Sequence, residues 1–372
     1  MREGWKYQKL GELVKVINGL WVGKKPPFTN VAVVRNANFT KSCTLDMSNI
    51  AYIDVEEKQF NTRELQYADI IIEKSGGSEK QPVGRPVFFN IKDRGYSFSN
   101  FTATLRVVSS DIVPEYLYKV LLAQYKQGVT KRLQSKTTGL HNLDFKSYLK
   151  SVIPIPSCEK QLSIVSELDK INELIRLKKE QLKDYDNLAQ SIFYEMFGDP
   201  VVNEKGWEVK KFADLYKLKS GDSLSAKNFV EGEIPVYGGN GISGYHNDFN
   251  MDGDFIIIGR VGVYCGNVRE VHGKFWLTDN AFQLYYNREI QYPCFIHYLL
   301  EILDLHHYAN AAAQPVISNL TLKDVEIIIP PLPLQQAFAQ RIELIKKQKA
   351  EIQNTIADLD TPLASRMQYW FD

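Results

Sequence analysis

The sequence reads Gly4-Trp5-x-x-x-Lys9-Leu10-x-Glu12-Leu13-x-Lys15, and 202 residues later it reads Gly206-Trp207-x-x-x-Lys211-Phe212-x-Asp214-Leu215-x-Lys217. The match has no gap and extends to Gly19 and Gly221. Two further matches follow in order, 68–72 with 253–257 and 139–143 with 316–320, at offsets of 185 and 177. The falling offset indicates shorter loops in the second copy. Copies this long exceed the roughly 20–50 residues of solenoid repeats, so we predict two similar domains, suited to a target in two parts.

Each copy ends in a tract of apolar residues at heptad spacing. One lysine interrupts each seam, Lys178 in the first tract and Lys349 in the second. A charge at a seam position costs stability but restricts register and partner. We therefore expect the two helices to pack against each other in one arrangement. The seams run through Ile164, Leu168, Ile171, Ile175, Leu182, Tyr185, Ala189, Ile192 and Met196, and through Phe338, Ile342, Ile345, Ile352, Ile356, Leu359 and Leu363.

Proline-rich segments mark where these helices begin, at 153–157 and 329–333, because proline disfavours helix at itself and at the residue before it. The first helix is expected over 159–197, about 58 Å long at 1.5 Å per residue. The second is expected from Gln335, with a break at Pro362, since Asp360-Thr361-Pro362 reads as a cap followed by a first-turn proline. Their length, strict period and duplication favour an exposed two-helix coil over helices buried against their own domains.

The segments before these helices carry short apolar runs among Gly, Asn, Asp and Pro, with one convincing helix each, at 114–127 and 293–307. Strands without intervening helical patterns favour an irregular sheet over a doubly wound fold. The predicted fold class is α+β: two similar mixed α/β domains, each followed by a long helix, the two helices forming an antiparallel coiled-coil spacer. The expected boundaries are 1–156 and 201–333 for the domains, and 157–200 and 334–372 for the helical segments. The strands are expected at 31–35, 50–54, 70–73, 87–91 and 102–108, and at 234–237, 255–259, 275–278 and 281–286.

Composition is that of an ordinary globular protein, with 372 residues, 44% apolar and 24% charged, but the charge is uneven. Residues 1–156 carry 23 Lys+Arg and 14 Asp+Glu, whereas residues 205–330 carry 11 and 15. The first domain therefore favours an anionic partner such as nucleic acid. No apolar run reaches the roughly 18–20 residues of a membrane span, and Met1-Arg2-Glu3-Gly4 does not open a signal peptide, so a cytoplasmic location is expected.

Glycine-containing loops follow the matched strands, at 74–81 and 259–262. Glycine permits close backbone approach to a phosphate, and Asn, Gln, Arg, Lys and Ser contact base edges or phosphates. The alternative for each residue is that the glycines only make turns and the polar side chains only cover a surface. The candidate DNA-binding residues are Lys24, Lys25, Lys74, Ser75, Lys80, Gln81, Arg85, Asn100, Asn240, His246, Arg260 and Asn280.

Several kinds of catalytic and cofactor site are disfavoured. Gly239-x-Gly241-x-x-Gly244 matches the dinucleotide fingerprint, but the sequence after it indicates a strand where the fingerprint requires a helix. Asp199 with Glu208-x-Lys210 resembles a nuclease triad only by chance, because Asp199 lies in the linker. The chain has no Walker A, HExxH, GxSxG or Asn/Asp-Pro-Pro-aromatic motif, and its histidines and four cysteines lack ligand spacing. We expect no catalytic residue, no metal and no cofactor in this chain.

The order of these motifs resembles the DNA-specificity subunit of type I restriction-modification enzymes. The resemblance spans essentially the whole chain, and the chain departs from the family pattern at 158–161, where the family usually has adjacent Glu-Gln, and in its acidic second domain. It rests on Gly4-Trp5 and Gly206-Trp207, on 234–245 (Ile-Pro-Val-Tyr-Gly-Gly-Asn-Gly-Ile-Ser-Gly-Tyr), on 153–156 (Ile-Pro-Ile-Pro) with Gln161, and on 329–336 (Ile-Pro-Pro-Leu-Pro-Leu-Gln-Gln).

The resemblance implies a non-catalytic subunit whose two target-recognition domains read the two halves of a split double-stranded DNA site. It further implies helices that space the domains and dock methyltransferase subunits, two in number, which hold S-adenosylmethionine and methylate adenine. Restriction and motor subunits would complete the complex. Candidate residues for docking the methyltransferase subunits are Tyr185, Phe193, Met196 and Trp370. Two other hypotheses remain: a two-headed protein-binding adaptor, and an enzyme that methylates or cuts DNA by itself.

Overall fold

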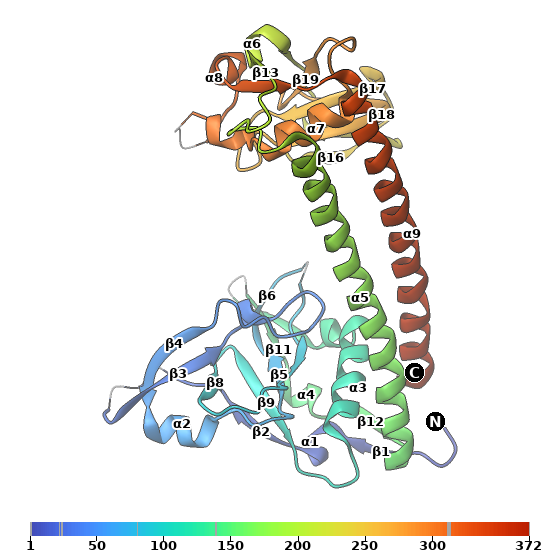
Figure 1. Ribbon diagram of the computed structural model, residues 1–372. Coiled ribbons are helices and arrows are strands. Elements are labelled where there is room, and N and C mark those ends of the chain that lie inside the picture. The colour runs from blue at the N-terminus through green and yellow to red at the C-terminus, as the bar shows by residue number, and fades with distance from the viewer. Residues whose placement is uncertain are drawn as a thin grey trace. The chain divides into compact units, whose positions relative to one another are not determined.

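The structure is a computed structural model that describes residues 2–21, 23, 25–79, 81–137, 140–310 and 314–371 (Figure 1). The chain forms two compact units, one of Met1–Leu177 with Ile356–Asp372 and the other of Lys178–Thr355. Two long helices, α5 (Cys158–Phe197) and α9 (Leu332–Phe371), each contribute one half to each unit. The boundaries expected from the sequence separate domains from helices, whereas the compact units divide each helix near its middle.

The first unit holds several small sheets and three clusters of buried apolar side chains among its described residues, of which the largest, built around residues 114–126, is its main core. Their strand orders are β2-β9-β5-β7, β4-β3-β8, β10-β11-β6 and β1-β12. The continuous apolar run at the start of β5 is fully buried, because β5 lies between β9 and β7. The described strands are β1 (Lys6–Lys9), β2 (Val14–Asn18), β3 (Phe28–Val34), β4 (Ala51–Glu56), β5 (Ile70–Glu73), β6 (Ser75–Gly77), β7 (Pro86–Phe88), β8 (Tyr96–Phe98), β9 (Thr102–Val107), β10 (Gln134–Thr137), β11 (Leu140–Leu143) and β12 (Val152–Ile155).

One helix of this unit, α3 (Pro114–Lys126), packs into the core and against the first half of α5. Proline opens it, at a position where the missing N–H has no intrahelical acceptor. Tyr116, Leu117 and Leu121 are fully buried, and Lys119 forms an ion pair with Asp169 of α5. The remaining helices are short: α1 (Leu10–Leu13), α2 (Glu57–Arg63), α4 (Phe145–Tyr148), η1 (Asn36–Asn38) and η2 (Thr130–Leu133).

The second unit joins most of its strands in one six-stranded order, β14-β19-β17-β18-β15-β16, with a separate β13-β20 pair. Its strands are β13 (Glu208–Lys211), β14 (Lys217–Ser220), β15 (Ile234–Gly238), β16 (Gly241–His246), β17 (Met251–Gly259), β18 (Val268–Leu277), β19 (Ala281–Tyr285) and β20 (Glu326–Ile329). Its described helices are α6 (Phe212–Leu215), η3 (Ala226–Asn228), α7 (Pro293–Ile302), η4 (Leu305–Tyr308) and α8 (Asn319–Leu322). Each expected strand overlaps an observed one, and both expected domain helices, α3 and α7, are present. The mixed α/β prediction is confirmed.

Backbone hydrogen bonds confirm the internal repeat and correct its alignment. Glu73 at the end of β5 pairs with Thr102, and Gly259 at the end of β17 pairs with Ala281, in equivalent sheets. The sequence match of 68–72 with 253–257 is therefore one residue out of register. The residues that cap α4 and α8, Asp144 and Ser318, are also equivalent, so the match of 139–143 with 316–320 is three residues out. Runs of β-branched residues resemble each other in several registers, and only the pairing partners distinguish them.

A buried glutamine joins each domain to the first turn of its long helix. Gln161 accepts a hydrogen bond from the backbone N–H of Val113, the residue that caps α3, at 2.8 Å, and it donates to the carbonyls of Asp111 and Pro156. Gln335 repeats this arrangement, accepting from Tyr292 N–H at 2.8 Å and donating to two carbonyls of its own unit. Both side chains are 0% exposed. The glutamine that follows each proline-rich segment thus satisfies backbone groups that would otherwise be buried without partners.

The two long helices pack against each other in both units and run antiparallel. In the first unit, Glu167 of α5 pairs with Arg366 of α9, and Ile175 shares a core with Leu363. In the second unit, Phe193 packs on Phe338 with ring centroids 5.7 Å apart. The seam lysine Lys349 forms an ion pair with Asp186 of the other helix, as a register-restricting charge should, whereas Lys178 bonds to Gln181 of its own helix. The paired-helix expectation is confirmed.

The expected break at Pro362 is wrong, because α9 is a single helix of 40 residues with this proline inside it. Proline removes one intrahelical hydrogen bond and crowds the preceding turn. Here the helix is held on both sides of the proline, since Leu359 packs against the first-unit core and Leu363 and Met367 lie within it. Tertiary packing therefore outweighs a cost of roughly 3 kcal/mol.

Candidate nucleic-acid interface

Polar side chains gather in the first unit where β5 ends and β6 begins. Lys74 follows β5 directly, and its Nζ donates to Asn18 Oδ1 at 3.1 Å. Its N–H donates to the carbonyl of Phe101 at 2.8 Å, and its carbonyl accepts from Leu143 N–H at 2.9 Å. The backbone of Lys74 is therefore fixed on both sides, while its ammonium lies half-buried beside a neutral amide. Burial lowers the pKa of Lys74.

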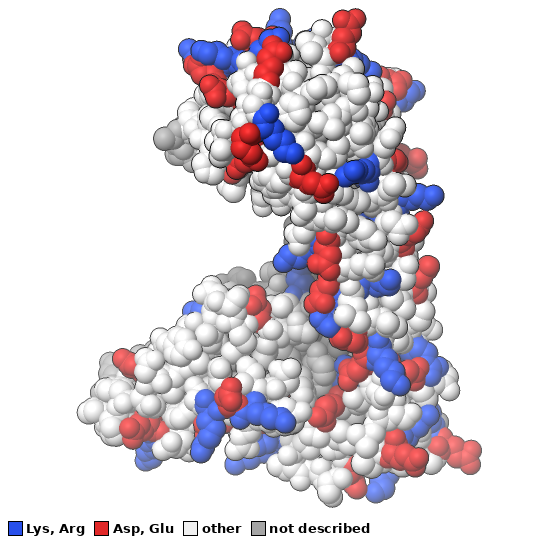
Figure 2. Space-filling model, in the orientation of Figure 1, with Lys and Arg blue, Asp and Glu red and all other residues white. Residues whose placement is uncertain are grey.

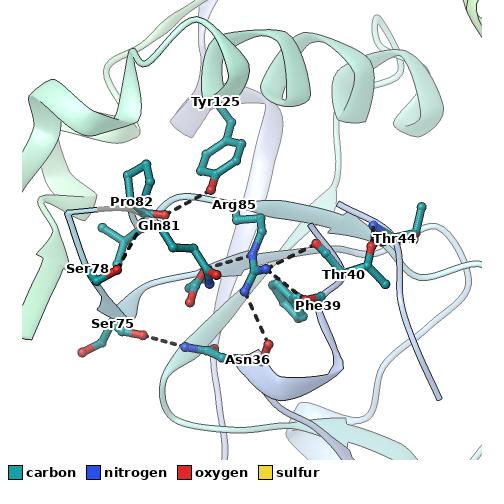
Figure 3. A network of polar contacts seen from close by, with 12 residues as sticks. Asn36, Phe39, Thr40, Thr44, Ser75, Ser78, Gln81, Pro82, Arg85 and Tyr125 are labelled. Atoms are coloured by element: carbon teal, nitrogen blue, oxygen red, sulfur yellow. Dashed lines mark hydrogen bonds and ion pairs between the residues drawn. The ribbon is translucent and has the colours of Figure 1, made fainter. Parts of the chain in front are cut away.

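Ser75 extends this cluster. Its carbonyl accepts from Asn36 Nδ2 at 2.7 Å, and its hydroxyl donates to Asn142 Oδ1 at 2.5 Å (Figure 3 shows the contact with Asn36). Asn100 lies in the turn beside Phe101, whose ring is 46% exposed. The structure thus brings together Lys74, Ser75 and Asn100. It adds Asn18, Asn36 and Asn142, which the sequence did not single out because they come from three separate segments.

Arg85, expected to reach DNA, is instead an internal support of this loop (Figure 3). It is 3% exposed, and its Nε pairs with Glu73 at 3.0 Å. Its remaining nitrogens donate to the carbonyls of Phe39, Thr40 and Asn36 at 2.9–3.4 Å. The guanidinium is almost fully buried and each of its three nitrogens has a partner, so the expectation of a DNA contact by Arg85 is corrected. Burial raises the pKa of the Glu73 carboxyl that faces it.

The other first-unit candidates are dispersed. Gln81 is exposed, and its backbone exchanges hydrogen bonds with Ser78 at 2.8 and 3.1 Å. Lys25 is exposed and lies before β3, whereas Asn36, which contacts Ser75, lies after that strand. The seven residues of β3, about 23 Å of extended chain, therefore separate Lys25 from the cluster around Lys74. Lys24 and Lys80 lie outside the described residues.

A second cluster lies at the equivalent place in the other unit. Arg260 follows β17 directly, and its Nη1 donates to Ser220 Oγ at 3.1 Å and to the carbonyl of Asp279 at 3.3 Å. Its N–H donates to the carbonyl of the exposed Asn280 at 2.9 Å. Gly239 packs against these segments so closely that an added Cβ would lie 2.9 Å from the carbonyl oxygen of Val261. This contact brings the exposed Asn240 next to Arg260 and Asn280.

His246 is not available for a DNA contact. It is 7% exposed, its Nδ1 accepts from the N–H of Val230 at 3.0 Å, and its ring packs edge-on against Trp276 with centroids 5.6 Å apart. The histidine is the last residue of β16, and its ring joins that strand to Val230 and Trp276. Its expected role is therefore corrected to a structural one.

Two of the expected partner-docking residues are also internal. Phe193 is 0% exposed among Phe197, Phe295 and Phe338. Trp370 is 7% exposed, and its Nε1 donates to Glu167 at 3.1 Å. Tyr185 and Met196 are partly buried against the second-unit core. The exposed apolar residues of the helices, which seam spacing could not identify, are Leu162, Leu174, Leu177, Leu188 and Tyr194 of α5, and Leu344 and Tyr369 of α9.

The surface charge is mixed, and the other motifs considered in the sequence can now be placed in the structure. On the face shown in Figure 2, acidic and basic side chains are interspersed over the second unit, in the upper part of the view. Among the described residues, no three His, Cys, Asp or Glu side chains are grouped to hold a metal ion. Asp199 accepts backbone N–H groups of its own turn, and Lys210 pairs with Glu208 at 3.1 Å. The third glycine of Gly239-x-Gly241-x-x-Gly244 lies inside strand β16, so no helix opens there. In the described part of the chain, no helix is long and apolar enough to cross a membrane.

Comparison with known proteins gives one consistent family. Residues 2–184 and 204–359 match the model of the type I restriction modification DNA specificity domain. The chain is similar to the specificity subunit of the type I restriction enzyme EcoprrI of Escherichia coli, with 29% identity over 220 residues, 55% of this chain and 54% of that subunit. This match spans about half the length of that relative. The chain is also 21% identical to the putative MjaX specificity subunit of Methanocaldococcus jannaschii, over 94% of this chain and 90% of that one.

Two solved structures share the fold. The S subunit of a type I restriction-modification system from M. genitalium aligns with a TM-score of 0.56 and 15% identity, over 99% of this chain and 96% of that chain. A chain solved in work on the assembly and conformational transition of the type I R-M system aligns with a TM-score of 0.60 and 17% identity, over 100% of this chain and 98% of that one. With the family model matching most of the sequence, this chain belongs to the type I restriction-modification DNA specificity family.

Proposed function

We propose that this chain is the DNA-recognition subunit of a type I restriction-modification complex, with one domain reading each half of a split target. The observation that supports this most strongly is that one framework presents different polar side chains at the same place in both units. Lys74, Ser75 and Asn100 lie there in the first unit, and Arg260 and Asn280 in the second. Repeated frameworks with different side chains suit a target made of two unlike halves.

The complex would act in the cytoplasm, and the chemistry would belong to other subunits. Two methyltransferase subunits would bind S-adenosylmethionine and methylate adenine, and restriction and motor subunits would complete the assembly. The exposed leucines and tyrosines of α5 and α9 offer an apolar surface for the methyltransferase subunits. The chain itself is the non-catalytic specificity subunit.

The long helices would set the length of the unread gap in the target. Helix α5 is continuous for 40 residues, about 60 Å at 1.5 Å per residue. One turn of B-DNA is roughly 34 Å, so a helix of this length would be long enough to serve two readers about a turn apart. Insertion of matched heptads in α5 and α9 should lengthen the gap without changing either half-site.

A DNA titration of the assembled complex tests this function. The complex should prefer a duplex that carries its target, and the logarithm of its affinity should fall linearly with the logarithm of salt concentration. If no duplex binds, with or without methyltransferase subunits, the chain is instead a two-headed protein adaptor. Methylation or cleavage by the isolated chain, given S-adenosylmethionine or magnesium, would overturn the non-catalytic assignment.

A further inference from the structure

The two recognition domains hold one cation each at structurally equivalent positions. Lys74 follows β5 and Arg260 follows β17, and each donates its backbone N–H to the residue just before the next paired strand, Phe101 or Asn280, at 2.8 and 2.9 Å. Each carbonyl accepts one long-range hydrogen bond, from Leu143 or from Ile317, at 2.9 and 3.0 Å. The two backbones are therefore fixed by the same set of bonds.

The side chains are held in the same way. Lys74 Nζ donates to Asn18, the last residue of β2, and Arg260 Nη1 donates to Ser220, the last residue of β14, both at 3.1 Å. Asn18 pairs with Ala103 of β9, and Ser220 pairs with Phe282 of β19, at corresponding positions of the two sheets. A neutral oxygen at the end of the same strand thus orients each cation.

Both cations lack a carboxylate among the partners that the described residues give them. The hydrogen-bond partners are an amide oxygen, a hydroxyl and a backbone carbonyl, and the Arg260 guanidinium also lies 5.4 Å from the centroid of the Phe282 ring. Two residues after each cation comes a glycine with positive φ, Gly76 at 97° and Gly262 at 85°. That conformation favours glycine; an added Cβ at Gly262 would meet nothing within 4 Å, whereas at Gly76 it would lie 3.1 Å from Asn36 Nδ2. Each site therefore offers an oriented positive charge that no carboxylate of the described residues neutralises, which is the chemistry that binds a phosphate.

The neighbours of the two cations differ. Ser75, Asn100 and Phe101 in the first unit correspond to Val261, Asp279 and Asn280 in the second, by the same backbone pairing. A phosphate accepts either lysine or arginine, whereas a bidentate base contact distinguishes the two. A position that is cationic in both units, while its neighbours differ, is suited to bind a backbone phosphate, because the phosphate is the same in every DNA sequence.

We propose that Lys74 and Arg260 are matched, sequence-independent anchors, each binding one backbone phosphate at an equivalent place in its half-site. The varying neighbours then read the bases. This inference rests on the proposed function, since it assigns a common docking geometry to the two domains. It places both domains on their half-sites in one orientation relative to the DNA backbone.

Variants that remove the positive charge, compared with variants that keep it, distinguish a residue that binds a phosphate from one that recognises a base. The variants are Lys74→Gln and Arg260→Gln, the retaining pair Lys74→Arg and Arg260→Lys, and the controls Lys170→Gln on α5 and Lys347→Gln on α9, where both lysines are exposed. Each assembled complex is titrated with two duplexes, one carrying the target mapped from methylated adenines and one with a half-site scrambled. Thermal unfolding of every variant checks that the fold is retained.

Each glutamine variant should reduce the salt slope by about 0.9 and weaken binding to both duplexes by the same factor. The arginine and lysine exchanges should keep the slope and the methylated sequence. An unchanged slope in Lys74→Gln or Arg260→Gln, or an altered half-site in Arg260→Lys, would overturn the inference. Failure of the unsubstituted complex to prefer the mapped target would instead reject the proposed function, so the two failures are distinguishable.

Discussion

The two units differ most in the strands that pair with β17 and β15 in the second unit, and with their counterparts β5 and β3 in the first. In the second unit, β18 is one strand of ten residues that pairs antiparallel with β17 and parallel with β15. In the first unit, two short strands divide these roles, β7 pairing with β5 and β8 with β3. Residues 89–95 interrupt the strand between them and leave two sheets where the second unit has one. The framework around β5 and β17 is the same in both units, so the difference lies at the periphery of the sheets and leaves the loops that follow β5 and β17 at equivalent positions.

Arg85, which is buried in an ion pair, and Arg260, which we propose as a DNA contact, should respond differently to replacement, and Arg85 gives the largest expected effect. Replacement of Arg85 by alanine leaves Glu73 buried without its charge partner and should cost roughly 3–5 kcal/mol. Replacement of Arg260 by alanine removes a partly exposed side chain with neutral partners and should cost under about 1 kcal/mol. Urea unfolding of both variants measures the contrast. Equal losses would mean that the two arginines play the same role.

The buried glutamines should behave alike, because they make the same three hydrogen bonds. Gln161→Leu and Gln335→Leu each leave one N–H and two carbonyls unsatisfied, at a cost of roughly 2–4 kcal/mol. The exposed neighbour Gln336 provides the control, and Gln336→Leu should change the free energy of unfolding by less than about 0.5 kcal/mol. A loss in only one of the two domains would show that the helix junctions are not equivalent.

The second domain carries an acid-sensitive junction with α9. Burial alone would raise the pKa of Glu270, but the Lys346 ammonium at 2.6 Å and the His297 ring at 3.5 Å lower it to about 2. Because the folded-state pKa lies below the ordinary value of 4.5, this stabilisation is complete above pH 4.5 and is lost as the pH falls toward 2. The loss should be roughly 3 kcal/mol.

Unfolding curves of the chain and of Glu270→Gln between pH 2.5 and 6 would measure this contribution. The variant should lack the part of the acid dependence that Glu270 supplies. At the place in α5 that corresponds to Lys346, the first unit has Asn172, whose side chain bonds to a carbonyl of its own helix. An identical pH profile in the variant would show that Glu270 does not contribute.

The smallest expected effect concerns the proline inside α9. Pro362→Ala restores an intrahelical N–H and should stabilise the chain by roughly 1–3 kcal/mol. Pro333 lies in the first turn of the same helix, where proline is tolerated, so Pro333→Ala should change stability by less than about 0.5 kcal/mol. Thermal unfolding of both variants compares the positions. Destabilisation by Pro362→Ala would mean that the helix depends on a bend at this residue.

The sequence predicted the duplicated framework because its signals are local. Apolar runs such as 70–72, the prolines before each long helix and the heptad spacing each specify one element without distant partners. The predicted register of the two copies and the predicted break of the second helix at Pro362 were wrong, because pairing across a sheet and packing against a domain decide them.

The candidate site was predictable only in part. Lys74 and Arg260 were identifiable as cations that follow matched strands. Arg85 looked the same in sequence, and only the fold shows that Glu73 and three carbonyls enclose it. Asn18, Asn36 and Asn142 come from separate segments, and no spacing connects them to Lys74. Burial of Phe193, Trp370 and His246 likewise depends on which face of each element meets a core.

Mapping of methylated adenines in host DNA, with and without this chain, tests the central claim most directly. Two domains that each read a half-site predict one split motif, with two defined halves and a constant undefined gap, that disappears when the chain is deleted. A methylated motif without a gap, or a motif that persists in the deletion strain, would contradict the account.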